Sequence, residues 1–282
     1  MPAQLVTSIA DIDSENRALI AAVVAATPFA FTTDVDGTIA PIAPTPEGAH
    51  VMAEVVPLLE FAQQRFAITA AISGRSVAAL WSMVHVPGLL YIGDHGNDMW
   101  QSQPDTVTAP PPPVLNPQVA EALALLAASP QLPPGLRFEP KGMTASIHFR
   151  NTPDPAATLA ALLSAMEPIT VATGTLIGMG KSVIEVKSPL SRSKGDAIRY
   201  LVTKRDIRGI VYIGDDRTDI DAFQAANELQ AAGQCQSFMV GVAQQGEAPP
   251  DLVLHTHILL ADISLVPEFI DWLFAQTPAY QE

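Results

Sequence analysis

Short apolar runs alternate with segments of helical composition along most of this chain. Apolar runs typical of buried strands occupy 30–33, 66–72, 89–92, 209–213 and 237–242. Segments with helical composition or periodicity occupy 14–26, 51–64, 76–83, 192–204, the residues from Asp219 onward, and 264–274. Strands that alternate with helices predict a parallel α/β sheet, in which ligands bind at the carboxyl ends of the strands.

The pattern changes in the middle of the chain. A proline-rich loop at 109–113 leads into a predicted helix at 118–128, an alternating strand at 143–150, a helix at 154–166 and strands at 169–172 and 182–187. This is an α+β composition, unlike the flanking βα units. We therefore predict an α/β core formed by 1–103 and 188–282, interrupted by an inserted α+β module at 104–187. The proline run is interpreted as a connecting loop rather than as a ligand for an SH3-type domain.

Composition narrows the possible partners. The chain has 282 residues, 48% of them hydrophobic, which is enough for a large core. Its net charge of −14 argues against a nucleic acid or an anionic membrane surface as the partner. The cations nevertheless gather in one stretch, as Arg137, Lys141, Arg150, Lys181, Lys187, Arg192 and Lys194. That stretch either handles a small anion or is a solvated basic face.

The chain's location is also suggested by its composition. Cys235 is the single cysteine, so no disulfide can form within the chain. The first residues carry acidic groups before their apolar run, unlike the basic start of a signal peptide, and the apolar stretch 18–31 is too short to span a bilayer and is broken by Pro28. We expect a soluble, cytoplasmic protein without a membrane partner.

Two carboxylates follow the first predicted core strand. Asp34 and Asp36 stand two residues apart after Thr33, and Gly37 allows a sharp turn just beyond them. Two negative charges that face one crevice are costly unless a cation neutralises them, and carboxylate oxygens suit Mg²⁺. The pattern therefore predicts a metal-assisted site in which one carboxylate acts as a nucleophile. The alternative is an ordinary acidic turn.

A second acidic cluster follows the strand at 209–213. It contains Asp215, Asp216 and Asp219, in the order Gly-Asp-Asp-Arg-Thr-Asp. If the two strands are adjacent, the two clusters form an oxygen cage for Mg²⁺ at one edge of the sheet.

Two further residues suggest a phosphate. Ser73 follows the strand at 66–72 and could donate its hydroxyl and backbone N–H to a phosphate oxygen, or it could simply cap a helix. Lys194 opens a predicted helix, where the macrodipole disfavours a cation, so either an anion compensates it or it is an exposed lysine.

These elements, in this order and with an insertion between the second and third, resemble the haloacid dehalogenase superfamily of phosphatases. The resemblance implies a Rossmann-like core with an inserted α+β cap domain. It implies that Asp34 attacks phosphorus to form an aspartyl-phosphate, and that Asp36 protonates the leaving oxygen and then activates water. The other implied residues are Ser73, Gly74 and Lys194 for the phosphoryl group, and Asp34, the backbone carbonyl of Asp36, and Asp215 for Mg²⁺, with Asp216 and Asp219 in support.

Finer motifs resemble trehalose-6-phosphate phosphatases. They are Ile72-Ser73-Gly74-Arg75, Gly93-Asp94-His95-Gly96, Phe138-Glu139-Pro140-Lys141-Gly142 leading to His148-Phe149-Arg150, and Gly180-Lys181 leading to Glu185. The substrate contacts that this resemblance implies are Arg75, His95, Glu139, Lys141 and Glu185. Two positions depart from the family pattern, because Asp94 and Ile220 stand where the family usually has Glu.

The sequence thus predicts a Mg²⁺-dependent phosphatase that acts on trehalose 6-phosphate, as a monomer in a pathway with a trehalose-6-phosphate synthase. One alternative is the same chemistry on sucrose phosphate or glucosylglycerol phosphate. Another is a non-catalytic phosphosugar-binding protein, against which the joint presence of Asp34, Asp36, Lys194 and Asp215 argues.

Three other signals are set aside. Thr175–Ser182 resembles a P-loop but has Thr at the first position and a β-branched strand after it. Asp11–Asn16 begins like a calcium-binding loop but lacks the glycine at its sixth position, so we expect a helix cap there. His255 and His257 lack a third ligand and are interpreted as a polar strand end.

Overall fold

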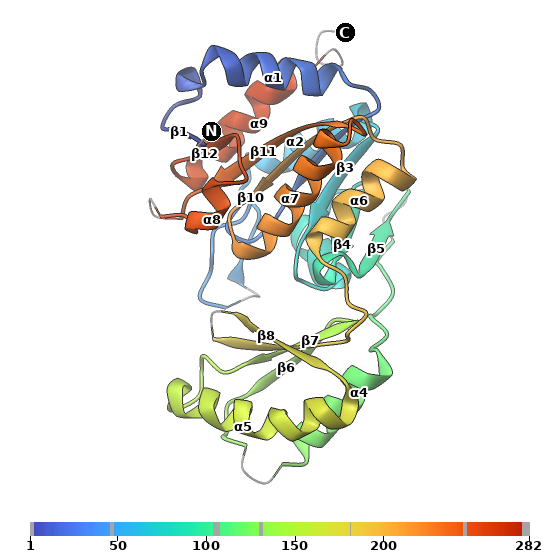
Figure 1. Cartoon of the computed structure of the whole chain (residues 1–282), viewed down its shortest axis with the longest axis vertical. Helices are drawn as coiled ribbons and strands as arrows, with labels where there is room; N and C mark the ends of the chain where they lie inside the picture. The colour runs from blue at the N-terminus through green and yellow to red at the C-terminus, as the bar shows by residue number, and fades with distance from the viewer. Residues whose placement is uncertain are drawn as a thin grey trace. The chain divides into compact units, whose positions relative to one another are not determined.

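The computed structural model describes residues 3–45, 48–103, 108–129, 132–180, 182–244 and 247–277. The chain divides into two compact units, one made of Met1–Pro110 with Arg192–Glu282 and the other of Pro111–Ser191 (Figure 1). Each unit has its own hydrophobic core and its own sheet. Residue 104, the predicted start of the inserted module, lies outside the described residues.

The described part of the larger unit contains an eight-stranded sheet of order β1-β12-β11-β10-β2-β3-β4-β5. The strands are β1 (Gln4–Val6), β2 (Phe29–Thr33), β3 (Ile68–Ile72), β4 (Leu90–Gly93), β5 (Asp98–Gln101), β10 (Gly209–Gly214), β11 (Gln236–Val242) and β12 (Ile258–Leu260). All neighbours are parallel except β4 and β5. This confirms the predicted parallel α/β sheet.

Helices cover both faces of this sheet because its strands are apolar on both sides. Along β10, Val211 and Ile213 pack into one core cluster, whereas Ile210 and Tyr212 pack into the other. The first cluster includes α1 (Ser14–Ala25), α2 (Val55–Arg65), α3 (Val77–Val84) and α9 (Val266–Ala275). The second includes α6 (Lys194–Lys204), α7 (Arg217–Ala231) and α8 (Pro250–Val253), with α6 and α7 side by side (Figure 1). The central strands β2 and β10 are therefore buried and rigidly held.

The smaller unit contains a four-stranded antiparallel sheet of order β6-β7-β9-β8 among its described residues. The elements are α4 (Pro117–Ala127), β6 (Arg137–Pro140), β7 (Thr144–His148), α5 (Pro155–Thr173), β8 (Leu176–Gly180) and β9 (Val183–Lys187). Ala145 and Ile147 of β7 share a core with Leu126 of α4 and Leu162 of α5. One face of the sheet is thus apolar and helix-covered.

The predicted strand at 169–172 is wrong, because these residues belong to α5. The helix continues past Pro168 since Leu162, Met166, Ile169 and Thr173 recur at helical spacing on its buried face. Burial of that face outweighs the hydrogen bond lost at the proline. By length and composition alone α5 could also cross a membrane, but here its inner face lies in the core of the smaller unit.

Candidate active site

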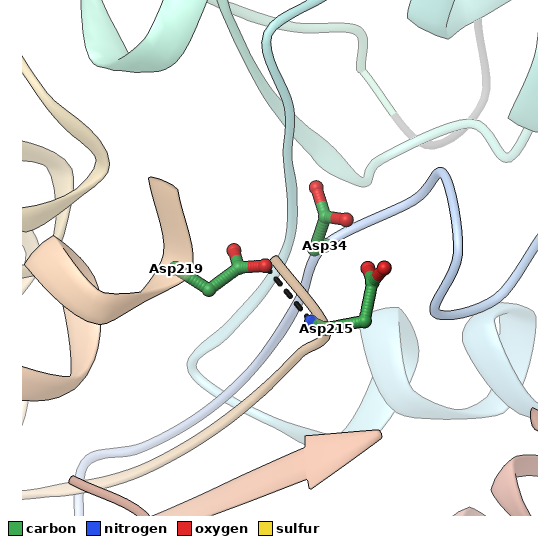
Figure 2. Close-up of side chains that lie close together, drawn as sticks. All are labelled: Asp34, Asp215 and Asp219. Atoms are coloured by element: carbon green, nitrogen blue, oxygen red, sulfur yellow. Dashed lines mark hydrogen bonds between the residues drawn. The ribbon is translucent and has the colours of Figure 1, made fainter. Parts of the chain in front are cut away.

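Two acidic segments meet at the centre of the larger sheet. Strands β2 and β10 are parallel neighbours, with Thr33 opposite Ile213, and the Asp34 amide donates to the Ile213 carbonyl at 2.8 Å. This adjacency confirms the condition on which the predicted cage depended. Carboxylate oxygens of Asp34, Asp215 and Asp219 lie within 4.8 Å of one another, and all three residues are buried. Figure 2 shows the three carboxylates close together, with Asp219 projecting from α7.

Both carboxylate oxygens of Asp219 accept hydrogen bonds from other groups of the site. Its Oδ2 accepts the backbone N–H groups of Asp215 at 2.9 Å and Asp216 at 3.0 Å; the bond to Asp215 is drawn in Figure 2. Its Oδ1 accepts hydrogen bonds from Lys194 Nζ, at 2.7 Å, and from the Tyr212 hydroxyl. With both oxygens engaged, Asp219 holds the loop and the lysine in place, while Asp34 and Asp215 keep more capacity for a ligand.

Lys194 links the two acidic segments. Its ammonium donates to Asp34 Oδ1 and to Asp219 Oδ1, each at 2.7 Å, and its side chain is only 2% exposed. The alternative that it is an exposed lysine is therefore wrong. Burial alone would lower the pKa of Lys194, but the Asp219 and Asp34 carboxylates raise it well above its ordinary value. The lysine therefore stays charged. It lies against Asp34 Oδ1, so it can bind an anionic group that approaches this carboxylate.

Fully ionised, this cluster of three carboxylates would carry more negative charge than one lysine can neutralise. Burial raises the pKa of Asp34 well above its ordinary value, although Lys194 opposes this. Burial, together with the charges of Asp219 and Asp216, raises the pKa of Asp215 to about 8. Carboxylates in this state gain by binding a second cation, and oxygen ligands suit a hard divalent ion. The residues present therefore fit a metal site.

A tight turn after β2 shapes this site. Gly37 has a φ of +89°, and a Cβ there would lie 2.2 Å from Asp215 Oδ2, so only glycine fits against that carboxylate. Thr38 donates its hydroxyl to Asp215 Oδ1 at 2.9 Å and lies 3.5 Å from Asp34 Oδ2. The Gln244 side chain donates to the Gly37 carbonyl from the loop after β11.

Thr38, Tyr212 and Gln244 were given no role by sequence reasoning. The signal for the first two was their position beside the acidic motifs, one inside Asp-Gly-Thr and one two residues before Gly214. Nothing in the sequence around Gln244 indicated its contact, because that contact joins residues 207 apart in the chain.

Asp36 lies outside this three-carboxylate cluster. Both of its oxygens accept hydrogen bonds from Arg75, from Nη2 to Oδ1 at 2.6 Å and from Nε to Oδ2 at 2.7 Å. Its side chain is 29% exposed, compared with 5% for Asp34. The structure therefore brings Arg75 to Asp36.

The predicted phosphate-binding turn follows β3. Ser73 is buried, and its hydroxyl accepts the Arg75 N–H at 3.2 Å. It is not a helix cap, since α3 is capped by Ser76 three residues later. Gly74 lies under the His95 ring, where a Cβ would come within 2.5 Å of that imidazole. This turn is joined to the turn after β4, because the His95 amide donates to the Ser73 carbonyl at 3.0 Å.

The remaining predicted residues lie on the polar face of the smaller sheet. Glu139, Ser146 and Glu185 occupy one row across β6, β7 and β9. Lys141 pairs with Glu185 Oε1 at 3.2 Å and Lys187 with its Oε2 at 2.9 Å. His148 pairs with Glu139 Oε2 at 2.7 Å, and this hydrogen bond lowers the Glu139 pKa. Lys181 lies outside the described residues.

Minor sequence signals are explained by the same structure. Asp13 caps α1 by accepting the Asn16 N–H at 2.8 Å, as expected for the acidic segment at 11–16. Ile220, one of the two departures from the family pattern, packs against the core beneath α7. Asp94, the other, is buried in the turn after β4 with a φ of 49°.

Comparison with known proteins places the chain in a family. Residues 32–249 match the trehalose-phosphatase family. Trehalose-phosphate phosphatase B of Arabidopsis thaliana is 28% identical over 210 residues, covering 69% of this chain and 55% of the relative. Trehalose-phosphate phosphatase of Mycobacterium avium is 30% identical over 201 residues, covering 68% of this chain and 50% of the relative. The chain thus spans about half the length of these two curated relatives.

Solved structures show the same fold. The C-terminal domain of the C. albicans trehalose-6-phosphate phosphatase aligns with a TM-score of 0.70 at 19% identity, covering 98% of both chains. A protein described as related to trehalose-6-phosphate phosphatase aligns with a TM-score of 0.64 at 23% identity, covering 89% of this chain and 99% of the other. From the extent of the sequence match, this chain belongs to the trehalose-phosphatase family.

Proposed function

We propose that this protein is a Mg²⁺-dependent phosphatase that hydrolyses trehalose 6-phosphate to trehalose and phosphate. The observation that carries the proposal is the buried Asp34 carboxylate, held by Lys194 beside Asp215 in a member of the trehalose-phosphatase family. A carboxylate in this position can be both a metal ligand and a nucleophile. A binding protein would not need a buried, charge-crowded carboxylate at this point.

The chemistry follows from the positions of the groups. In the first step an Asp34 oxygen bonds to phosphorus as the bond to the sugar oxygen breaks, and Asp36 gives that oxygen its proton. In the second step Asp36 takes a proton from water, which attacks phosphorus and releases Asp34 and inorganic phosphate. Lys194, with Ser73 and Gly74, orients the phosphoryl oxygens. The ligands of the cation would be Asp34, Asp215 and the backbone carbonyl of Asp36. Bound Mg²⁺ would neutralise negative charge on the phosphoryl oxygens.

The sugar would be recognised by the smaller unit, which we propose to be the cap domain. Glu139, Lys141 and Glu185 offer carboxylate acceptors and an ammonium donor on one polar face, a set that suits sugar hydroxyls. Arg75 and His95 in the larger unit are proposed to face the substrate as well. The single buried cysteine fits a reducing compartment and supports a cytoplasmic location. We propose that the enzyme acts as a monomer on the product of a trehalose-6-phosphate synthase.

Phosphate release tests this proposal. Purified protein should be assayed with trehalose 6-phosphate, sucrose 6-phosphate, glucosylglycerol phosphate and glucose 6-phosphate, with and without Mg²⁺. Mg²⁺-dependent release, with the highest kcat/KM for trehalose 6-phosphate, is expected. A higher kcat/KM for another member of the panel would reassign the substrate. Tight binding of trehalose 6-phosphate without any release would instead identify a phosphosugar-binding protein.

A further inference from the structure

Asp36 pairs with an arginine rather than with the lysine of the site. Asp34 and Asp219 both pair with Lys194 at the sheet edge, whereas Asp36 pairs with Arg75. Both Asp36 oxygens are engaged, one by Nε and one by Nη2, at 2.7 and 2.6 Å. Two parallel bonds of this kind fix the orientation of the carboxylate plane as well as its location.

The arginine itself is held by the backbone of two turns. The Arg75 amide donates to Ser73 Oγ at 3.2 Å, and the Arg75 carbonyl accepts the Asp94 amide at 2.7 Å. The Arg75 side chain is only 16% exposed. A side chain anchored at its base and paired at its tip has little freedom, so Arg75 can serve as a rigid support.

The Asp36 side chain needs a group that holds it in place, because it is less buried than the Asp34 side chain. A proton donor must lie within hydrogen-bond reach of the oxygen it protonates, and a misplacement of 1 Å can cost about a hundredfold in rate. In the described part of the chain, Lys194 pairs with Asp34 and Asp219 and not with Asp36. The guanidinium fork is therefore the group that determines where the Asp36 oxygens lie.

We propose that Arg75 is a positioning residue for Asp36, and that it acts on the protonation of the leaving oxygen through that carboxylate. The inference rests on the proposed function. The step concerned is the first one, in which the bond from phosphorus to the leaving oxygen breaks, the Asp34–phosphorus bond forms and the proton passes from Asp36 to the leaving oxygen. Each Asp36 oxygen uses one lone pair for its bond from Arg75, so the delivered proton is carried on a remaining lone pair. Without the fork, Asp36 would populate other rotamers and deliver this proton less often.

A series of substituted phenyl phosphates separates this role from a sugar contact. None of these esters carries sugar hydroxyls, and their leaving phenols differ mainly in basicity. A weakly basic leaving group such as p-nitrophenolate needs little help from an acid, whereas unsubstituted phenolate needs more. The dependence of kcat/KM on leaving-group basicity therefore reports on Asp36 as an acid, because kcat/KM contains no step that follows departure of the phenol.

The variants are Arg75→Gln, Arg75→Lys and, as a control, Arg199→Gln. Arg199 also pairs with a carboxylate of the larger unit, Glu228, but at an exposed position in α6. Lysine keeps the charge of Arg75 but not the planar fork. An Arg75→Gln, Asp36→Asn double variant shows whether the effect passes through Asp36.

We expect Arg75→Gln to lower kcat/KM for phenyl phosphate about a hundredfold, and for p-nitrophenyl phosphate less than about tenfold. Arg75→Lys should behave similarly, Arg199→Gln should match wild type, and the double variant should be no slower than Asp36→Asn alone.

An equal loss of kcat/KM for every ester, no loss for any ester, or full rescue by lysine would overturn the inference and leave Arg75 as a charge that binds substrate. Failure of the proposed substrate is a separate result. It would appear as wild-type protein that hydrolyses the phenyl esters but not trehalose 6-phosphate. Absence of Mg²⁺-dependent hydrolysis of every ester by wild type would overturn both proposals.

Discussion

Replacing Asp215 by Asn should stabilise the metal-free protein, although the residue is buried and hydrogen-bonded. Burial, with the charges of Asp219 and Asp216, raises the pKa of Asp215 from an ordinary value of 3.8 to about 8. Between these two values the folded protein binds a proton that the unfolded chain releases. The free energy of unfolding must therefore fall as the pH rises through this window.

The size of the effect follows from the width of the window. One differentially bound proton changes the free energy of unfolding by about 1.4 kcal/mol per pH unit, so wild type should lose about 3 kcal/mol between pH 5 and pH 7. Asparagine has no proton to lose, and its side-chain oxygen can still accept the bond from Thr38. The stability advantage of Asp215→Asn should thus grow by about 3 kcal/mol over this range, or roughly 6–12 °C in Tm.

The adjacent residue supplies a matched control of opposite sign. Burial disfavours the Asp216 carboxylate, but Lys194 and the Thr218 hydrogen bonds more than offset this and lower its pKa. Asp216 also caps α7. Asp216→Asn should therefore destabilise the metal-free protein, by about 1 kcal/mol, since asparagine remains a good cap but lacks the charge.

Thermal unfolding followed by circular dichroism, on protein dialysed against EDTA, measures both changes at pH 5, 6 and 7. Mg²⁺ should then raise the Tm of wild type more at pH 7 than at pH 5, because the ion must displace the proton. It should have no effect on the Tm of Asp215→Asn. A lower Tm for Asp215→Asn than for wild type would refute the idea that the acidic cluster destabilises the protein without a cation. A Tm difference between the two proteins that does not change with pH would refute it as well.

Three further predictions address the reaction. Asp34→Asn should abolish turnover, by several orders of magnitude in kcat, with an unchanged circular dichroism spectrum; near wild-type kcat would rule out an aspartyl-phosphate. EDTA should remove activity and added Mg²⁺ should restore it in the phosphate-release assay, and full activity after exhaustive chelation would count against a metal-dependent site. Glu139→Ala should lower kcat/KM for trehalose 6-phosphate roughly ten- to a hundredfold while hydrolysis of p-nitrophenyl phosphate barely changes, because only the sugar ester has hydroxyls to lose; an equal loss for both esters would contradict the proposed sugar contact.

Most regular elements could be predicted from the sequence alone. The strands β2, β3, β4, β10 and β11 are apolar runs between helical segments, and they lie within a residue or two of their predicted bounds. Such runs are informative because a strand buried on both faces is a nearly continuous run of apolar residues. The acidic segments that follow β2 and β10 were also evident, since polar residues after a buried strand interrupt a strong pattern.

Elements with weak local patterns were missed. The strands β1, β5 and β12 have three or four residues, and β5 is antiparallel at an edge of its sheet. Segments this short do not show a periodicity, and their pairing partners are supplied by the rest of the chain. The end of α5 was misjudged for a related reason, because the partners that bury Ile169 and Thr173 lie in the core of the smaller unit.

What the sequence by itself determined was therefore the α/β class and the chemical groups at the strand ends. The tertiary structure decided how these groups are paired. It placed Lys194 between Asp34 and Asp219, which are 160 and 25 residues away from it in the chain. It also paired Asp36 with Arg75, 39 residues away. These pairings depend on which strands are neighbours and on how each turn projects its side chains. Both are fixed by packing over the whole unit, and neither is encoded in the spacing of the residues within any one segment.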